Sequence, residues 1–284
     1  MTRAAAAGSA VPVRRTAPHL PPLRWAGSKR AVLPLFVDLV PARYRTYIEP
    51  FAGSASLFFR LAPRSAILGD INTELVLFYE VLATQPQALS RALSRLMRRK
   101  ADYYDVRATE PSTLTSVNAA ARFLYLNRKC FNGVYRTNRQ GAFNVPEGHH
   151  TGAMPSFARL KAAADALRSA ELYNADFEDT IARARAKDFV YLDPPYARRR
   201  SRRPGEYGYA AFDGGVDIER LSAGLAELDH RGAYFMLSYS RSPSLLRRIP
   251  WTWKRTIGVT RNVGGYRSSR RIAQEVVVGN YELP

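Results

Sequence analysis

The first part of the chain alternates strand-like apolar runs with helical spacing, and no other feature constrains the fold as strongly. Residues 46–51 predict a strand, and a turn of small residues at 52–54 separates it from a predicted helix over 55–61. A second predicted strand over 65–69 ends at Asp70. Strands that alternate with helices pair in parallel and are covered by those helices, so the sequence predicts the first half of a doubly wound α/β domain.

An insertion interrupts this alternation and splits the predicted domain. Residues 86–167 begin with helical spacing and continue into a turn-rich stretch over 127–148. The α/β pattern then resumes in strands over 172–177, 189–192 and 233–238, a helix over 217–228, and a closing pair of strands over 251–259 and 275–281. We therefore predict a doubly wound, Rossmann-like sheet built from residues 23–85 and 168–284, with an antiparallel terminal hairpin and a mostly helical inserted lobe over 86–167.

The charge of the chain points to a polyanionic partner. The sequence has 43 Lys and Arg residues against 24 Asp and Glu residues, which gives a formal net charge of +19. Such an excess is typical of proteins that bind a phosphate backbone. The sequence has no apolar run long enough to cross a membrane. Residues 1–22 are rich in Ala, Arg and Pro and contain no acid, so we predict a flexible basic tail rather than a secretory signal.

Cysteine and histidine usage argues against disulfide and metal chemistry. Cys130 is the only cysteine, which excludes an intramolecular disulfide and a cysteine-based zinc site. His149 and His150 lie in a glycine-flanked loop, where we expect them to face solvent. We therefore predict no metal site, and a protein of the reducing cytoplasm that associates with the nucleoid if its partner is DNA.

The segment Asp193-Pro194-Pro195-Tyr196 follows the predicted strand over 189–192 and has the groups needed to hold a flat heterocycle. The carboxylate can accept a hydrogen bond from an exocyclic amino group. The two prolines fix the backbone so that carbonyl oxygens after the acid can point inward as further acceptors. The Tyr196 ring offers a stacking face for a base taken out of its duplex. The alternative is an ordinary strand that ends in a Pro-Pro turn with an incidental acid.

Acidic residues at strand ends also predict a nucleoside pocket. The turn from Phe51 to Ser54 joins a strand to a helix, a geometry that leaves backbone N–H groups available to a polar ligand. Asp70, at the end of the next strand, suits the two hydroxyls of a ribose, although it could instead cap the following helix. Asp176 and Phe177, at the end of a later strand, suit the amino group and the face of an adenine.

Five segments, in this order, resemble the motifs of the Dam-type DNA adenine-N6 methyltransferases (D12 class, alpha group). They are Arg24–Lys29, Glu49–Ser54, Gly69–Asn72, Leu126–Pro146 and Asp193–Tyr196, and the resemblance extends from about Leu23 to Tyr281. The sequence departs from the family pattern at two places. Ala55 stands where many members have a second glycine. Residues 197–204 are arginine-rich where the family usually has a proline and small hydroxyl residues.

The resemblance implies S-adenosylmethionine as the methyl donor. In the family, the acid that matches Asp70 binds the ribose, and the pair that matches Asp176 and Phe177 binds the adenine. The acid that matches Asp193 lies at the junction between cofactor and target base. The full set of positions implied in cofactor binding is Trp25, Lys29, Phe51, Gly53, Asp70, Ile71, Asp176, Phe177 and Asp193.

The resemblance also implies direct, in-line transfer of the methyl group to N6 of an adenine that has left duplex DNA, without a metal or a covalent nucleophile. The residues implied in catalysis are Asp193, Pro194, Pro195 and Tyr196. Those implied in DNA binding are Phe131, Asn132, Arg136, Asn138 and Pro146.

Two of the DNA-binding positions have sharper expected roles. Family members with this segment often recognise GATC, and we expect Arg136 to contact a guanine there. Phe131 either enters the gap that the base leaves or packs in the core. Double-stranded DNA is the implied partner, and a cognate restriction endonuclease that acts on the same site is a second.

Other functions remain open at this stage. The same acid-Pro-Pro-aromatic segment would serve an enzyme that methylates N4 of cytosine or a base in RNA. A DNA-binding relative without catalytic activity is a second alternative, although the sequence keeps Lys29, Asp70 and Asp193. A nicotinamide oxidoreductase is a distant third, because the turn after the first strand lacks a complete G-x-G-x-x-G fingerprint.

Overall fold

The computed structural model of the chain describes residues 11–12, 20–25, 28–29, 32–98, 102–138, 140–149, 151–195, 217–240, 242–262 and 270–284. Several expectations fall outside the described residues. They concern Tyr196, His150, the arginine-rich segment, and residues 1–10 and 13–19 of the predicted tail. Within that tail, β1 (Val11–Pro12) pairs antiparallel with β2 (Arg43–Tyr44).

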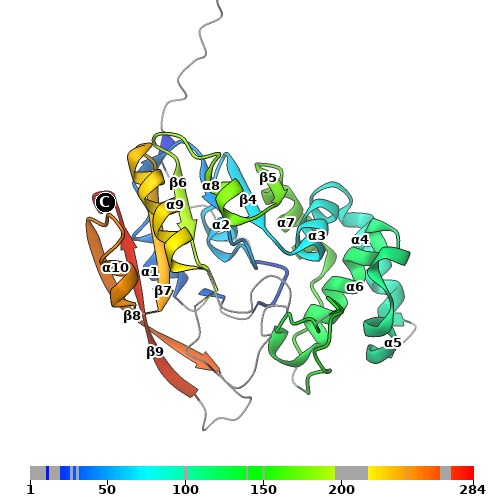
Figure 1. The fold of residues 1–284 in the computed structure, drawn as a ribbon. Helices are drawn as coiled ribbons and strands as arrows, with labels where there is room; N and C mark the ends of the chain where they lie inside the picture. The colour runs from blue at the N-terminus through cyan, green and yellow to red at the C-terminus, as the bar shows by residue number, and fades with distance from the viewer. Residues whose placement is uncertain are drawn as a thin grey trace, which may run out of the picture.

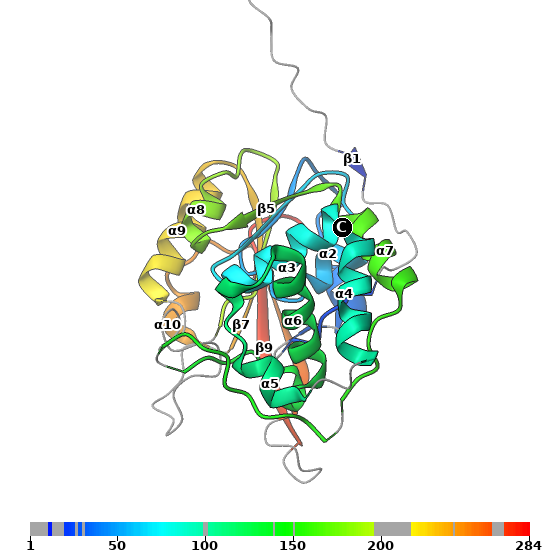
Figure 2. The ribbon, with the colours of Figure 1, turned by 90° about the vertical axis from the view of Figure 1, so that its right-hand side faces the viewer.

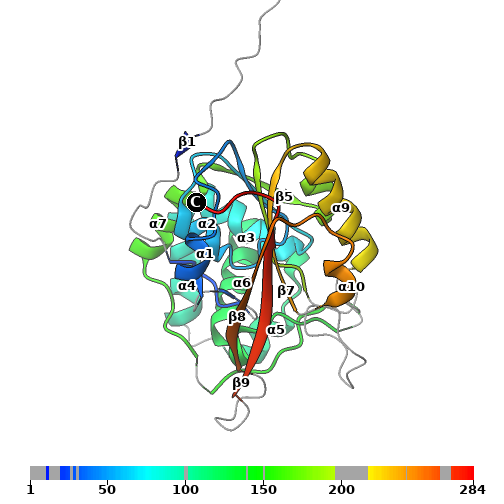
Figure 3. The ribbon, with the colours of Figure 1, turned by 90° about the vertical axis from the view of Figure 1, so that its left-hand side faces the viewer.

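A seven-stranded sheet forms the centre of the molecule, in the order β5-β4-β3-β6-β7-β9-β8 (Figure 1). Five strands are parallel: β3 (Tyr47–Glu49), β4 (Ala66–Asp70), β5 (Ala170–Asn174), β6 (Phe189–Leu192) and β7 (Tyr234–Ser240). β9 (Arg270–Gly279) pairs antiparallel with β7 and with β8 (Trp253–Asn262). Figure 3 faces the long β8–β9 pair. The predicted α/β class is therefore confirmed.

The strand order reverses between β3 and β6, at the middle of the sheet. From β3 the chain adds β4 and then β5 on one side, and it returns to add β6 and then β7 on the other. In open parallel sheets the helical crossovers diverge at such a reversal, which leaves a crevice at the carboxyl ends of the two central strands. The fold thus places a crevice after Glu49 and after Leu192.

Helices cover both faces of the sheet because the buried strands alternate their side chains between two cores. Phe189 and Tyr191 of β6 pack with α1 (Leu33–Val37), α2 (Ser56–Leu61), α3 (Thr73–Thr84) and α7 (Phe157–Leu167). Val190 and Leu192 pack on the opposite face with α8 (Phe177–Ile181), α9 (Ile218–His230) and α10 (Pro243–Leu246).

A group of helices extends the first core beyond the edge of the sheet. It consists of α4 (Pro86–Arg98), α5 (Tyr103–Ala108) and α6 (Ser116–Lys129), with the short 3-10 helices η2 (Pro111–Thr113) and η3 (Phe131–Gly133). α6 packs against α3, α4 and α5, and α7 packs against α3 and α4 (Figure 2). α3 therefore links the sheet to these helices.

Two details differ from the sequence prediction. β5 ends at Asn174 rather than at residue 177, because Asp176 is the N-cap of α8 and its carboxylate accepts from the Glu178 N–H. The sequence reading had no helix over Phe157–Leu167, although Leu160, Ala163, Ala164 and Leu167 are buried at helical spacing. Among the described residues, no helix is both long and apolar enough to cross a membrane.

Candidate active site

A cleft at the carboxyl ends of β3, β4 and β6 collects most of the predicted site residues. The empty space in and in front of it, open solvent included, is about 1060 Å³. All nine predicted cofactor positions line it, together with Pro194 and Pro195. These residues come from five separate segments of the sequence, and the reversal of strand order brings them together. Pockets at this place in α/β sheets bind nucleotides and related ligands.

The turn after β3 approaches the cleft with its backbone. Gly53 has a φ of +47°, and a Cβ atom there would lie 2.9 Å from the indole of Trp25. The position therefore requires glycine for both conformation and space. The buried Tyr79 hydroxyl donates to the Gly53 carbonyl at 2.8 Å and so fixes the orientation of the turn. Ala55 also has a left-handed backbone, with a φ of 48°, at the position where many family members have a second glycine.

Asp70 closes the same turn from the end of β4. Its Oδ2 accepts from the Gly53 N–H and its Oδ1 from the Asn72 N–H, both at 2.9 Å. Asn72, not Asp70, caps α3 by accepting from the Leu75 N–H. Burial raises the pKa of the Asp70 carboxyl from 3.8 to about 6, against the opposing effect of the backbone donors. Each carboxylate oxygen keeps a second lone pair, so the group can still accept from a ligand's hydroxyls.

Two aromatic rings form the wall beyond Asp70. Phe51 and Phe177 stack with centroids 5.2 Å apart and an angle of 24° between the rings. Asp176, beside Phe177, is already engaged twice: it caps α8 and forms a 2.8 Å ion pair with Arg220. Asp176 lines the cleft and also caps α8. The predicted hydrogen bond with an adenine amino group would add a further contact to this carboxylate.

Asp193 is held at the other end of the cleft by a lysine. Lys29 Nζ donates to both carboxylate oxygens at 2.7 Å. The same ammonium lies 3.6 Å from Glu275 Oε2 on β9, and Ser238 Oγ donates to that oxygen at 3.4 Å. Lys29 and Glu275 are buried, whereas Asp193 is 20% exposed. The carboxylate of Asp193 is thus fixed in direction, while part of it faces the cleft.

A second buried acid lines the cleft between Asp70 and Asp193. Glu49, at the end of β3, accepts from the Tyr47 hydroxyl at 2.8 Å. Its pKa lies well above the ordinary value, first because of burial and further because of the negative charge of Asp193. A positive charge that enters the cleft would therefore stabilise the ionised form of Glu49 and lower its pKa.

The sequence reasoning missed several residues that line the cleft. The most notable are three hydroxyl groups: Ser28 and Ser56 lie 3.0 Å apart, and Ser54 lies 2.9 Å from Ser56. Ser54 and Ser56 flank the positive-φ residue Ala55, so the turn motif itself was the available signal. Glu49, Asn72, Tyr135 and Tyr191 also line the cleft. Tyr135 lies in the Leu126–Pro146 segment of the resemblance, but the sequence analysis assigned it no role.

The predicted DNA-binding residues lie in one segment, residues 131–148, which we call the recognition segment. It leaves α6 at Cys130 and folds back on itself through antiparallel bridges between Thr137 and Phe143 and between Cys130 and Glu147. The Phe131 ring is 37% exposed and lies outside the core. The Phe131 N–H donates to the Pro146 carbonyl at 2.9 Å. Asn132, the next residue in the chain, has a left-handed backbone.

Two polar residues of the recognition segment form bonds within it. Arg136 Nε donates to the Asn144 side-chain oxygen at 2.7 Å, which holds the guanidinium from one side. The Asn138 side-chain oxygen accepts from the N–H groups of Gln140 and Ala142, both at 3.0 Å. Asn138 therefore has a structural role at the tip of the segment, whatever it contributes to DNA.

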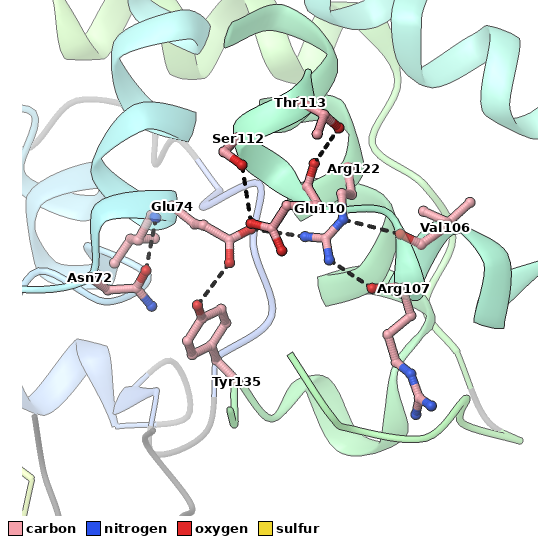
Figure 4. Close-up of polar contacts among 10 residues, drawn as sticks. Asn72, Glu74, Val106, Arg107, Glu110, Ser112, Thr113, Arg122 and Tyr135 are labelled. Atoms are coloured by element: carbon pink, nitrogen blue, oxygen red, sulfur yellow. Dashed lines mark hydrogen bonds and ion pairs between the residues drawn. The ribbon is translucent and has the colours of Figure 1, made fainter. Parts of the chain in front are cut away.

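A polar cluster connects the recognition segment to α3 (Figure 4). The Tyr135 hydroxyl donates to Glu74 Oε1 at 3.0 Å, and Arg122 donates to Glu74 Oε2 at 3.0 Å. Arg122 also donates to the carbonyls of Val106 at 3.1 Å and Arg107 at 2.8 Å. A single carboxylate on α3 thus joins α5, α6 and the recognition segment.

The donors and acceptors of the cleft fit S-adenosylmethionine. The Gly53 turn, which a Cβ would fill, and the Asp70 carboxylate suit a ribose, and the stacked Phe51 and Phe177 suit a heterocycle. The Asp193 carboxylate, at the other end of the cleft, suits the positive charge of a sulfonium. Elsewhere, Cys130 is a buried thiol whose pKa burial raises to about 11. No group of three metal-ligating side chains occurs within the described ranges.

Comparisons with known proteins agree on one class of enzyme. The chain matches the family described as D12 class N6 adenine-specific DNA methyltransferase over residues 25–256. It is 33% identical over 268 residues to the Type II methyltransferase M1.LlaDCHI of Lactococcus lactis subsp. cremoris, covering 91% of this chain and 94% of the relative. It is 32% identical to the Type II methyltransferase M.MjaIII of Methanocaldococcus jannaschii, with 78% and 84% covered. It is 34% identical to a DNA adenine methylase of Vibrio cholerae, with 62% and 64% covered.

Proposed function

The chain belongs to the D12 class of N6 adenine-specific DNA methyltransferases, and we propose that it methylates N6 of a flipped adenine at GATC sites in duplex DNA. The methyl donor is S-adenosylmethionine. The observation that carries the proposal is the ion pair between Lys29 and Asp193, which lies in the same cleft as Asp70 and the Gly53 turn. One cleft thereby offers a nucleoside subsite and, at its far end, an oriented acceptor for a second base.

The cofactor subsite takes up the first half of the cleft. Asp70 accepts from the ribose hydroxyls, Phe51 and Phe177 hold the adenine ring, and Asp176 accepts from its amino group. Trp25, Lys29, Gly53 and Ile71 complete the wall. S-adenosylmethionine supplies an electrophilic methyl group on a sulfonium, so the protein needs to provide alignment and charge rather than a nucleophile.

Asp193 and the two prolines after it bind the target base. The exocyclic nitrogen of adenine is a poor nucleophile because its lone pair is delocalised into the ring. Hydrogen bonds from N6 to the Asp193 carboxylate and to a backbone carbonyl near Pro194 and Pro195 favour the form in which the lone pair points at the methyl. Asp193 need not be a strong base, because the methylated nitrogen loses a proton readily. Tyr196 stacks on the base.

The inserted region, residues 86–167, is the proposed target-recognition lobe. Arg136 contacts a guanine in the major groove, and Asn144 orients its guanidinium. Phe131, with its exposed ring, occupies the gap that the adenine leaves. Asn132, Asn138 and Pro146 complete the contact surface. The net charge of +19 supplies the phosphate contacts that position the duplex.

A restriction-modification partner is part of the proposal. Two of the relatives carry the name Type II methyltransferase. We expect a cognate restriction endonuclease that acts on the same site, in the cytoplasm where the DNA lies. Plasmid methylated by this protein should resist that endonuclease, and cleavage at the untreated rate would remove the partner from the proposal.

The decisive experiment maps the product. Unmethylated duplex DNA rich in varied short sites is incubated with the protein and S-adenosylmethionine, and modified bases are identified chemically and located in the sequence. N6-methyladenine confined to GATC supports the reaction, the target and the role of Arg136 together. N6-methyladenine at another site keeps the reaction and removes the GATC assignment.

Two other results would replace the proposal. N4-methylcytosine would make the chain a cytosine amino methyltransferase that uses the same cleft. Binding of cofactor and DNA without any product would identify either an enzyme for RNA bases or a relative without activity, and the same assay on RNA separates those two.

A further inference from the structure

Tyr135 belongs to the recognition segment but lines the cofactor cleft. Its neighbour Arg136 bonds to Asn144 inside the recognition segment, whereas the Tyr135 ring and hydroxyl contact residues of the catalytic half. Successive side chains of an extended backbone point to opposite sides, which explains how two adjacent residues face different sites. Because the two residues share a peptide bond, a backbone displacement at one of them also moves the side chain of the other.

The Tyr135 ring rests on a cofactor residue. It stacks on the indole of Trp25 with centroids 5.9 Å apart and an angle of 16° between the rings. The same indole lies so close to Gly53 that an added Cβ would approach it to 2.9 Å. Trp25 is thus in contact with the cofactor turn and with the recognition segment at once.

The Tyr135 hydroxyl is anchored to the catalytic half by Glu74. Glu74 lies in the first turn of α3, directly after the Asp70–Asn72 turn, and its second oxygen pairs with the buried Arg122 of α6 (Figure 4). Burial and the charge of Glu74 raise the pKa of Tyr135, so the phenol stays a neutral donor at every pH at which the protein works. Deprotonation of the phenol therefore does not break this hydrogen bond.

We propose that Tyr135 is a positioning residue that couples the two sites, so that cofactor and cognate DNA strengthen each other's binding through Trp25, Tyr135 and Glu74. The inference rests on the proposed function, since it assigns the cleft to S-adenosylmethionine and the recognition segment to DNA. Ligand in the cleft fixes Trp25 against the Gly53 turn, and Trp25 in turn fixes Tyr135 and the backbone of Arg136. Coupling of this kind is reciprocal: each ligand raises the affinity of the other by the same factor.

The test measures that factor directly. The dissociation constant of S-adenosylhomocysteine, which binds without reacting, is determined by calorimetry with the protein alone and with a saturating duplex that contains the mapped site. The ratio of the two constants is the coupling factor, and we expect about fivefold or more for the unaltered protein. Tyr135→Phe keeps the ring and removes only the hydroxyl. It should lower the coupling factor by roughly threefold or more, while the constant without DNA changes by less than about twofold.

Glu74→Gln weakens the same contact from the other partner, because a neutral amide accepts less strongly than a carboxylate. It also removes the charge that pairs with Arg122, so the double variant should show the coupling factor of Glu74→Gln alone. Tyr173→Phe is the matched control. The Tyr173 hydroxyl donates to Glu171 at 2.7 Å on β5, so that variant removes a similar phenol–carboxylate bond away from the lining of the cleft. It should leave the coupling factor unchanged.

Three outcomes would overturn the inference. They are a coupling factor of one in the unaltered protein, an unchanged factor in both Tyr135→Phe and Glu74→Gln, and a loss of cofactor affinity that is equal with and without DNA. The last would make Tyr135 an ordinary part of the cleft wall. The proposed function fails separately, if the unaltered protein forms no N6-methyladenine.

Discussion

The cleft and the recognition segment hold the side chains of their proposed sites by different means. In the cleft, Asp70 ends strand β4 and is fixed by backbone N–H groups, whereas Asp193 follows strand β6 and is fixed by a buried lysine. In the recognition segment, Arg136 and Asn138 are fixed by other parts of the same short segment. These two acids are therefore held in place before any ligand arrives. Substitutions there should change chemistry without changing the fold, whereas in the recognition segment the two effects overlap.

The largest expected effect tests the rigid side of this comparison. Asp193→Ala should reduce methyl transfer by about 10³-fold or more, because it removes the acceptor aimed at the target nitrogen. DNA binding, which depends on other residues, should remain largely intact. Single-turnover methylation and a DNA-binding titration measure the two quantities on the same protein. Asp179→Ala, which removes an exposed acid of α8 outside the cleft lining, is the control.

Near-normal turnover by Asp193→Ala would exclude the assignment of Asp193. A parallel loss of activity and DNA binding would mean that the loss of the Asp193 carboxylate disturbs the structure around Lys29. The comparison between rigid and adaptable halves would then fail.

The second prediction uses the raised pKa of Asp70. Its carboxylate must be ionised to accept strongly from ribose hydroxyls, so cofactor affinity should fall as the pH falls through about 6. Asp70→Asn should weaken cofactor binding by about 10–100-fold at neutral pH, since hydrogen bonds to a charged group contribute about 1.5–3 kcal/mol. Its binding should also vary less between pH 5 and pH 7, about one unit to either side of the pKa. Calorimetric titration at a series of pH values measures both.

Stability without ligand should respond to pH in the opposite sense. The pKa of Asp70 in the fold, about 6, lies above its value of 3.8 in the unfolded chain. The fold therefore binds this proton more tightly, and the group increases stability as the pH falls from 6 towards 4. The difference in unfolding free energy between Asp70→Asn and the unaltered protein isolates this contribution. A difference that is constant with pH would show that Asp70 titrates normally.

The same contrast explains what the sequence could predict. Asp70 and Asp193 follow apolar strands, and the ends of parallel strands meet at one edge of a sheet, so local patterns were enough to bring them together. The contact between Lys29 and Asp193 was not predicted, because the two residues lie 164 positions apart and no periodicity links them. The resemblance to a family implied each of them in cofactor binding separately. Glu275 was missed because its role depends on the insertion of β9 beside β7.

Prediction was weaker in residues 86–167. Their turns, bridges and side-chain bonds leave no regular spacing in the sequence. Tyr135 and Asn144 differ little from other polar residues until the segment is folded. The buried face of α7 did have helical spacing, but short alanine-rich stretches give a weak signal between longer elements.

Arg136→Ala tests the adaptable side of the comparison. If Arg136 contacts guanine, its loss should reduce discrimination at one base pair by about 1–3 kcal/mol, with a smaller effect on non-specific binding. Competition between the mapped site and its single-base variants measures this quantity. Arg168→Ala, which removes an arginine that is 73% exposed on the chain after α7, controls for the loss of one positive charge. An equal loss of affinity for all sequences would make Arg136 a phosphate contact.

The smallest expected effect separates structure from recognition at Asn138. Its side-chain oxygen accepts two backbone N–H groups at the tip of the recognition segment. Asn138→Ala should therefore lower the unfolding free energy by about 1 kcal/mol, and Asn138→Asp, which keeps the acceptor, should recover most of that loss. Thermal unfolding without DNA measures this, because the phosphate backbone would repel the new acid. If both variants unfold like the unaltered protein and Asn138→Ala still loses discrimination, then Asn138 acts on the base pair directly. In that case the recognition segment would resemble the cleft more closely, because its functional side chains would not be needed to keep it folded.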